Sequence, residues 1–301
     1  MRWKDLRRST NVDDRRNREG AYGPGRIVFP RGGGGRTAGI GGIGAIVLVL
    51  LMLFFGIDPS LILSEGGLTG PGPSVPIPGQ QLPDTAEQAE LRDFVAAVLG
   101  DTEETWNVLF QAEGIEYQEP RLVLFSGAVQ SACGFANAAV GPFYCPPDQQ
   151  VYLDLSFFTD LERRLGAAGD FAAAYVVAHE VAHHVQYQLG TMDKVNRVRA
   201  GLGEEEANEI SVMVELQADC LAGVWANHAH RERDLLEIGD IEEGLNAAAA
   251  VGDDRLQRRA QGYAVPESFT HGSSEQRVTW FTRGFESGNR DACDTFTAGQ
   301  L

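Results

Sequence analysis

The chain has 301 residues, of which 43% are hydrophobic and 22% charged, an ordinary composition for a folded protein with one substantial domain and appendages. The net charge of −17 is uneven, because the first 36 residues carry ten basic and four acidic side chains and the remainder therefore carries −23. An acidic domain repels phosphate backbones, which argues against nucleic acid as its partner.

Residues 1–36 are polar and rich in arginine, and they end in the run Arg31-Gly-Gly-Gly-Gly-Arg36. This composition is typical of disordered segments. We therefore predict a basic, disordered tail.

Residues 37–57 are predicted to form a transmembrane anchor, since the twenty residues from Ala38 to Ile57 contain no charged side chain. A helix of that length covers the hydrocarbon thickness of a bilayer. The alternatives are a buried core helix and a cleaved signal peptide, whose apolar region is usually shorter. Arginines before the stretch and none just after it favour a single-pass protein of the cell membrane, with a cytoplasmic N-terminus and the folded domain in the periplasm or outside the cell.

Residues 58–84 are rich in glycine and proline and are predicted to form a linker. The folded domain is expected to occupy residues 85–301. Apolar spacing in the domain predicts helices at 86–99, 171–189, 204–227 and, with breaks, 239–260, and short strands at 121–125 and 151–155. The predicted fold class is α+β: a mainly helical domain with a small β-sheet, preceded by one transmembrane helix.

Four cysteines lie after the predicted anchor, and an even number in an exported domain suggests two disulfides. Cys133 and Cys145 flank a short loop and are the natural first pair, which leaves Cys220 to bond Cys293. Three pairings are formally possible from sequence, and a cysteine zinc site is disfavoured because no CxxC pair is present.

The expected helix 171–189 contains the motif His179-Glu180-Val181-Ala182-His183. Two histidines four residues apart project from one face of a helix, so both can bind the same Zn²⁺. Glu180 is placed to take a proton from zinc-bound water, the nucleophile in this chemistry. The alternative to a metal site is that these are two surface histidines without a function.

A catalytic zinc site needs a third protein ligand, and the expected helix 204–227 offers two acids. Glu215 and Asp219 are four residues apart, so Glu215 can bind the metal while Asp219 orients a ligand histidine through its other ring nitrogen. The reverse assignment stays open, with Asp219 as the ligand, as does a reading in which both are solvated acids.

Together these residues resemble the bacterial neutral zinc metallopeptidase family, whose members are membrane-anchored and gluzincin-like. The segments that carry the resemblance are His179–Gln186, Asn208-x-x-Ser211, Glu215–Trp225, His271-Gly-Ser-Ser-Glu-Gln-Arg277 and Ala132–Pro146. The resemblance covers nearly the whole chain and implies a zincin-like metallopeptidase domain with His179, His183 and Glu215 on zinc and Glu180 as general base.

The arrangement is also similar, more distantly, to CAAX-protease and HtpX-like peptidases, in which a downstream histidine is expected to stabilise the oxyanion. That resemblance implies a catalytic role for His271, supported by Arg277, although Gly272 stands where proline is common. An ordinary turn histidine is the alternative, and Tyr263 is a weaker candidate donor. Those relatives bury their sites among several spans, so a membrane-embedded substrate is not implied.

The function expected from the sequence is a membrane-anchored zinc endopeptidase that cleaves exported or envelope proteins, with Zn²⁺ as cofactor and the membrane contacted through one helix. Substrates of this class add as an extended strand to a sheet edge, for which residues 151–155 are the candidate. The alternatives are a catalytically silent zinc-containing surface or scaffold module, a structural envelope component held by its disulfides, and a zinc hydrolase of non-peptide amides.

Overall fold

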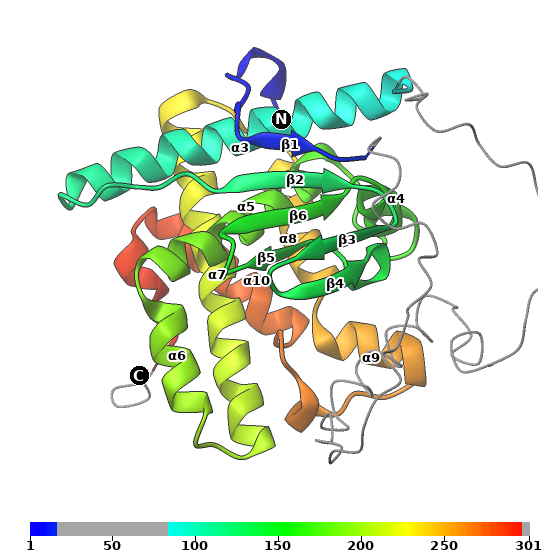
Figure 1. The fold of residues 1–301 in the computed structure, drawn as a ribbon, viewed down its shortest axis with the longest axis vertical. Coiled ribbons are helices and arrows are strands. Elements are labelled where there is room, and N and C mark those ends of the chain that lie inside the picture. The colour runs from blue at the N-terminus through cyan, green and yellow to red at the C-terminus, as the bar shows by residue number, and fades with distance from the viewer. Residues whose placement is uncertain (17–83, 297–301) are drawn as a thin grey trace, which may run out of the picture. The chain divides into compact units, whose positions relative to one another are not determined.

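The computed structural model describes residues 1–16 and 84–296, and within these it is a mainly helical α+β fold (Figure 1). Its strands are β1 (Val12–Asp14), β2 (Arg121–Phe125), β3 (Ala128–Ser131), β4 (Gly134–Asn137), β5 (Phe143–Cys145) and β6 (Gln150–Asp154). Its helices are α3 (Ala86–Ala112), α4 (Ser156–Arg163), α5 (Asp170–Gln188), α6 (Thr191–Arg199), α7 (Glu204–Arg233), α8 (Asp240–Ala250), α9 (Asp253–Gln261) and α10 (Ser274–Ser287). Short 3-10 turns are η1 (Trp3–Asp5), η2 (Ala138–Val140), η3 (Pro266–Ser268) and η4 (Arg290–Cys293).

The main sheet has the strand order β1-β2-β6-β5, in which β1, β2 and β6 are parallel and β5 is antiparallel to β6. Strands β2 and β6 are apolar and buried almost throughout, as strands covered on both faces are. The prediction that residues 151–155 form a sheet edge is therefore wrong, because β6 has a neighbour on each side. Strand β5 lies at that edge of the described sheet.

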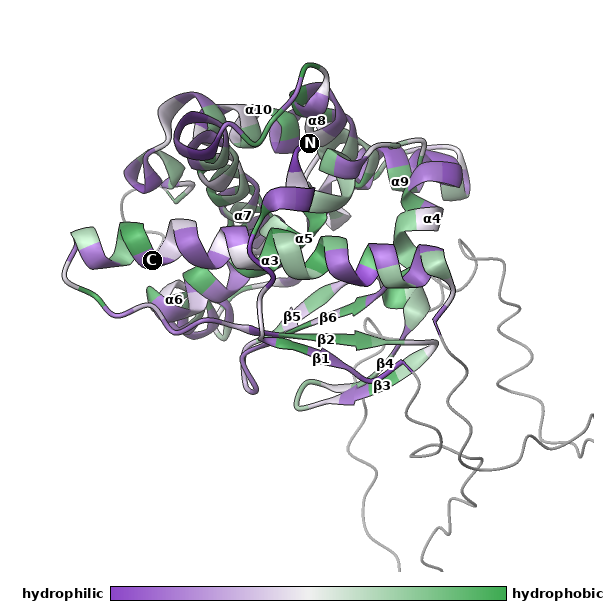
Figure 2. Cartoon of the chain, turned by 90° about the horizontal axis from the view of Figure 1, so that it is seen from above, coloured by the Kyte–Doolittle hydropathy of each residue, from purple (hydrophilic) through white to green (hydrophobic). Residues whose placement is uncertain are grey.

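The two faces of the sheet are covered by different elements (Figure 2). Leu122 and Leu124 of β2, with Val151 and Leu153 of β6, face the main core and its helices. The alternate side chains face the β3–β4 hairpin in a smaller cluster, made of Val123, Phe125, Val129, Cys145 and Tyr152. The Cys133–Cys145 disulfide ties this hairpin to β5.

Helix α5 runs through the centre of the domain, and every residue from Phe171 to Gln186 is buried. It packs against α3, α7 and α8. Phe171 stacks on Trp225 of α7, with ring centroids 5.9 Å apart. A helix enclosed on all sides gives its polar side chains fixed partners, which matters for the histidines it carries.

Helices α7 and α10 approach each other closely because each has a glycine at the crossing. A Cβ on Gly223 would lie 2.1 Å from the Phe281 carbonyl oxygen, and one on Gly284 would lie 1.9 Å from that of Cys220. This approach brings Arg277, near the start of α10, onto Asp219 of α7.

Helix α3 continues well past residue 99, where the predicted helix ended. The polar residues that follow do not end it, because Asp101 is buried and accepts hydrogen bonds from Trp225 and Arg233. Helix α7 likewise extends to Arg233, and the predicted helical region 239–260 divides into α8 and α9.

Residues 1–15 pack on the domain, so the prediction of a disordered tail is wrong for this part of residues 1–36. Trp3 is buried against Phe94 of α3, the amine of Met1 donates to Asp170, and β1 pairs with β2. The average composition of the tail conceals these few anchors, which make residues 1–15 and 84–296 parts of one compact unit.

The fold prediction must also be corrected for its transmembrane helix. Among the described residues, no helix is both long and apolar enough to cross a membrane. The stretches predicted as anchor (37–57) and linker (58–84) lie outside the described residues, apart from Asp84.

Candidate metal centre

Helix α5 places His179, Glu180 and His183 inside the domain, with at most 9% of each residue exposed. The helical repeat brings the two histidine rings side by side, with centroids 4.8 Å apart and planes nearly perpendicular. Burial in a close-packed helix fixes their orientation.

Helix α7 brings the Glu215 carboxylate to the same place. One oxygen lies 3.1 Å from Nε2 of His179 and the other 3.5 Å from Nε2 of His183. Ligands about 2 Å from a tetrahedral zinc lie roughly 3.3 Å from one another, so this arrangement fits the ion. One ligand atom from each of these residues lies within 4.8 Å of the other two.

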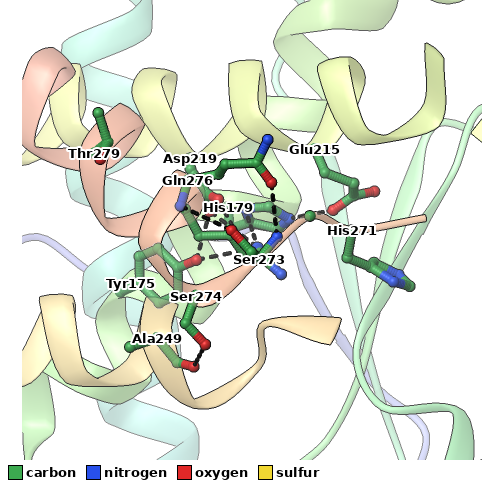
Figure 3. Close-up of polar contacts among 12 residues, drawn as sticks. Tyr175, His179, Glu215, Asp219, Ala249, His271, Ser273, Ser274, Gln276 and Thr279 are labelled. Carbon is green, nitrogen blue, oxygen red and sulfur yellow. Dashed lines mark hydrogen bonds and ion pairs between the residues drawn. The ribbon is translucent and has the colours of Figure 1, made fainter. Parts of the chain in front are cut away.

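Asp219 lies one helical turn from Glu215, on the far side of the His179 ring (Figure 3). Its carboxylate accepts from Nδ1 of His179 at 2.9 Å and from the Tyr175 hydroxyl, and Arg277 donates to both of its oxygens, at 2.9 and 2.8 Å. This geometry matches the arrangement in which Asp219 orients His179 while Glu215 faces the metal position, rather than the reverse. Tyr175 is a member of this network that the sequence reasoning missed.

Burial raises the pKa of the Asp219 carboxyl, but the charges of Arg277 and His179 outweigh it and lower this pKa below its usual value. Burial lowers the pKa of His179, but its carboxylate partners Asp219 and Glu215 dominate and raise it to about 9. The two carboxylates thus favour the protonated His179 ring, and a metal bound at Nε2 would compete with a proton for that atom.

His183 is oriented by an amide instead of a carboxylate. Its Nδ1 donates to Oε1 of Gln186 at 2.9 Å, and Gln186 is entirely buried. Sequence reasoning missed Gln186, although its position three residues after His183 on the same helix was the available signal.

Glu180 is buried beside the two histidines. Burial raises the pKa of its carboxyl above the usual value, although His183 and His179 pull it down. A raised pKa brings a carboxylate closer to the neutral range in which a general base works best.

His271 lies in the loop before α10, near Glu215 in Figure 3, and its side chain is 53% exposed. Asp253 holds this loop, because one carboxylate oxygen accepts from the backbone N–H groups of Thr270, His271 and Gly272. The other oxygen lies 3.3 Å from Nδ1 of His271. Sequence reasoning did not identify Asp253, which is 18 residues from the histidine.

Partial desolvation by its neighbours lowers the pKa of His271, but the hydrogen bond that its ring donates to Asp253 and the charge of Glu215 outweigh this and raise the pKa. Gly272 has φ of +91°, which proline cannot adopt, so this loop conformation requires a residue other than proline here. Tyr263 is 62% exposed, whereas Arg277 is buried on Asp219. The structure thus joins Arg277 to the His179 side of the site and His271 to the Glu215 side.

Strand β5 is linked to α5 immediately beside His183, the second candidate ligand. The Tyr144 hydroxyl of β5 lies 3.0 Å from Nδ1 of His184, the residue after His183. His184 therefore connects the sheet edge to the helix that carries the metal site, and its ring faces away from the ligand group.

Both disulfides have the expected pairing, Cys133–Cys145 and Cys220–Cys293. The second disulfide joins α7 to η4, and its cysteine on α7, Cys220, directly follows Asp219. The described residues contain no free cysteine.

The chain is 45% identical over 298 residues to the uncharacterized protein YpfJ of Escherichia coli K12, covering 98% of this chain and 99% of that protein. It is 40% identical over 259 residues to the uncharacterized proteins Mb2605 of Mycobacterium bovis and Rv2575 of Mycobacterium tuberculosis, covering 83% of this chain and 86% of each. No solved structure matches the chain. The family described as Putative neutral zinc metallopeptidase matches residues 1–296, and the chain therefore belongs to this family.

Proposed function

We propose that the protein is a zinc-dependent endopeptidase in which His179, His183 and Glu215 hold the metal. The observation that carries the proposal is the convergence of two imidazole nitrogens and one carboxylate at distances that suit a single zinc ion. The donor set leaves a fourth position for a non-protein ligand, as catalytic rather than structural zinc sites do.

Zinc in this site would supply a Lewis acid that activates water and polarises the scissile carbonyl. Glu180 is the residue of this chain that would take the proton of the attacking water and pass it to the leaving amine, helped by a pKa that burial raises. Asp219 would keep His179 in the orientation that binds the metal, and Arg277 would hold Asp219 in place. His271, next to Glu215, is our candidate for a donor to the developing oxyanion.

We further propose that the substrate is an extended peptide that pairs with β5. This strand lies at the edge of the described sheet and is tied to α5 through Tyr144 and His184. Backbone pairing at an edge gives affinity with little sequence preference, which suits an endopeptidase. Two disulfides favour an oxidising compartment, so we propose exported or envelope proteins as substrates.

The test is the Glu180→Gln variant of the full-length chain, compared with the wild type for zinc content and for cleavage of a broad peptide library. We expect one zinc per chain in both proteins and loss of cleavage by at least about 100-fold in the variant, because general-base catalysis contributes this much. Glu205→Gln, on the exposed start of α7, is the control and should cleave like the wild type.

Unchanged cleavage in Glu180→Gln would show that Glu180 is not the base. A wild type that holds zinc but cleaves no peptide of the library would identify a zinc-containing binding module instead. A wild type without zinc would remove the basis of the proposal.

A further inference from the structure

Gln186 has all the hydrogen-bonding groups of its amide engaged inside the protein. Its Oε1 faces Nδ1 of His183 at 2.9 Å, while its Nε2 donates to the Val214 carbonyl at 2.8 Å and to Oε1 of Gln217 at 3.0 Å. An amide nitrogen has two hydrogens, so both are used here.

Gln217 continues this chain of hydrogen bonds to the C-terminal segment. Its Nε2 donates to the backbone carbonyl of Cys293 at 3.0 Å, and Cys293 is bonded to Cys220 of α7. The Gln186 and Gln217 side chains together with the Cys293 carbonyl are called the amide relay below.

Two backbone carbonyls fix the direction of every bond in the amide relay. The Cys293 carbonyl can only accept, so Gln217 must turn its nitrogen toward it and its oxygen toward Gln186. Gln186 must then present its nitrogen to Gln217 and to the Val214 carbonyl, which leaves its oxygen for His183. When the His183 ring is neutral its proton therefore lies on Nδ1, and Nε2, the atom that faces Glu215, keeps the electron pair that a metal would need.

We propose that the amide relay is a positioning device for the second metal ligand, and that the Cys220–Cys293 disulfide anchors its far end. The inference rests on the proposed zinc site and adds residues that the motif does not contain. It also gives η4 a role, because η4 supplies the Cys293 carbonyl. This carbonyl can only accept, and it thereby fixes which groups of the amide relay donate and which accept.

A neutral orienting group suits this position for electrostatic reasons. Glu180, Glu215 and Asp219 already bring three carboxyl groups to the site, offset by Arg277. A fourth carboxylate against His183 would add buried negative charge without a partner, which is costly. An amide fixes the ring without changing the charge.

The experiment compares full-length wild type with Gln186→Met and Gln217→Met, which keep side-chain length but cannot form the relay. Zinc affinity is measured by competition with a chelator. We expect it to fall by about 10–100-fold in Gln186→Met, the usual effect of removing a partner that orients a ligand, and by less in Gln217→Met, where the Val214 carbonyl still holds Gln186. Gln188→Met, on the same helix but bonded to the Gln118 carbonyl, is the matched control and should bind zinc like the wild type.

A second readout separates positioning from general loss of structure. In ¹⁵N-labelled metal-free protein, the imidazole shifts of His183 should report the Nδ1–H form in wild type and a mixture of tautomers in Gln186→Met, while thermal unfolding shows that the variant is folded. Cys220→Ser/Cys293→Ser should give a smaller loss of zinc affinity than Gln186→Met. If Gln186→Met does not fold, Gln217→Met decides the question by the same two measurements.

The relay is overturned if zinc affinity and the tautomer of His183 are both unchanged in the folded variants. This outcome differs from failure of the proposed function, in which the wild type itself holds no zinc. In that case the tautomer measurement still tests whether the relay orients His183.

Discussion

The metal centre between α5 and α7 and the N-terminal segment, residues 1–15, are both rich in charged side chains, yet they are stabilised in different ways. In the metal centre the charges are buried and paired: Asp219 and Arg277 are at most 3% exposed. In the N-terminal segment the exposure of the ion pairs varies: Arg8–Asp93 is partly exposed, whereas the Met1 amine is buried against Asp170 and Arg7 reaches the buried carboxylate of Glu103. The segment is also held by buried Trp3 and the β1–β2 pairing. Charge therefore surrounds the proposed chemistry in one region and supports docking in the other.

The largest effect is expected for Glu215→Ala in the metal centre. Structural zinc sites bind with about 10–16 kcal/mol, so the loss of one of three protein ligands should cost about 4 kcal/mol, or roughly a thousand-fold in zinc affinity. Chelator competition measures this change. Glu209→Ala, exposed on the same helix, is the control, and equal zinc affinity in the two variants would exclude Glu215 as a ligand.

Arg277→Met should lower the free energy of unfolding by about 3 kcal/mol, because it leaves the buried carboxylate of Asp219 without its main counter-charge. The loss is at the lower end of the range for such changes, since Tyr175 and His179 still donate to Asp219. Denaturant unfolding of metal-free protein measures it. Arg283→Met, exposed on the same helix, should change stability by much less, and similar values for the two would contradict the buried-charge argument.

These two variants concern the part of the fold that sequence could predict best. A spacing of four residues fixes which side chains share a helix face, so His179 with His183 and Glu215 with Asp219 follow from local geometry alone. Which pair meets which other pair depends on how the helices pack. Tyr175 and Gln186 lie at helical spacing from the histidines but share that spacing with many residues that have no role, and Asp253 reaches His271 only through tertiary structure. The close approach of α7 and α10 depends on Gly223 and Gly284, which a sequence reader cannot pair without the structure.

The N-terminal segment shows the opposite limit. Its average composition indicates disorder, and the position of Trp3 against Phe94 is a contact between residues far apart in the chain. The sheet was predicted only as two short strands, and their central and edge positions depend on β1 and β5, whose short sequences have little periodicity. The prediction of the zinc ligands depends least on such long-range contacts, because His179, His183 and Glu215 lie on α5 and α7, the two most regular helices.

Trp3→Ala sharpens the comparison by weakening the N-terminal segment alone. We expect a loss of about 2 kcal/mol in the free energy of unfolding, less than for a tryptophan deep in a core, because a segment near the chain end can relax into the space. Zinc affinity should stay unchanged. Phe135→Ala, at an exposed side chain, is the control, and reduced zinc affinity in Trp3→Ala would show that the two regions are coupled.

The smallest effect on the free energy of unfolding is expected for Asp93→Asn, which removes the ion pair between Asp93 of α3 and Arg8 of the N-terminal segment. Arg8 bonds both oxygens of Asp93, at 2.9 and 2.7 Å, and lowers the pKa of this carboxyl below its ordinary value of 3.8. A carboxyl whose pKa is lower in the folded state stabilises the protein above its unfolded pKa, and this contribution is lost as pH falls through the folded value. Both side chains are partly exposed, so the free energy of unfolding of the wild type should exceed that of the variant by less than about 1 kcal/mol at pH 7. This difference should vanish as the pH falls below 3.8. Urea unfolding across this pH range, with Arg8→Gln and the double variant completing the cycle, measures the pair, and a difference that grows on acidification would contradict the assigned sign.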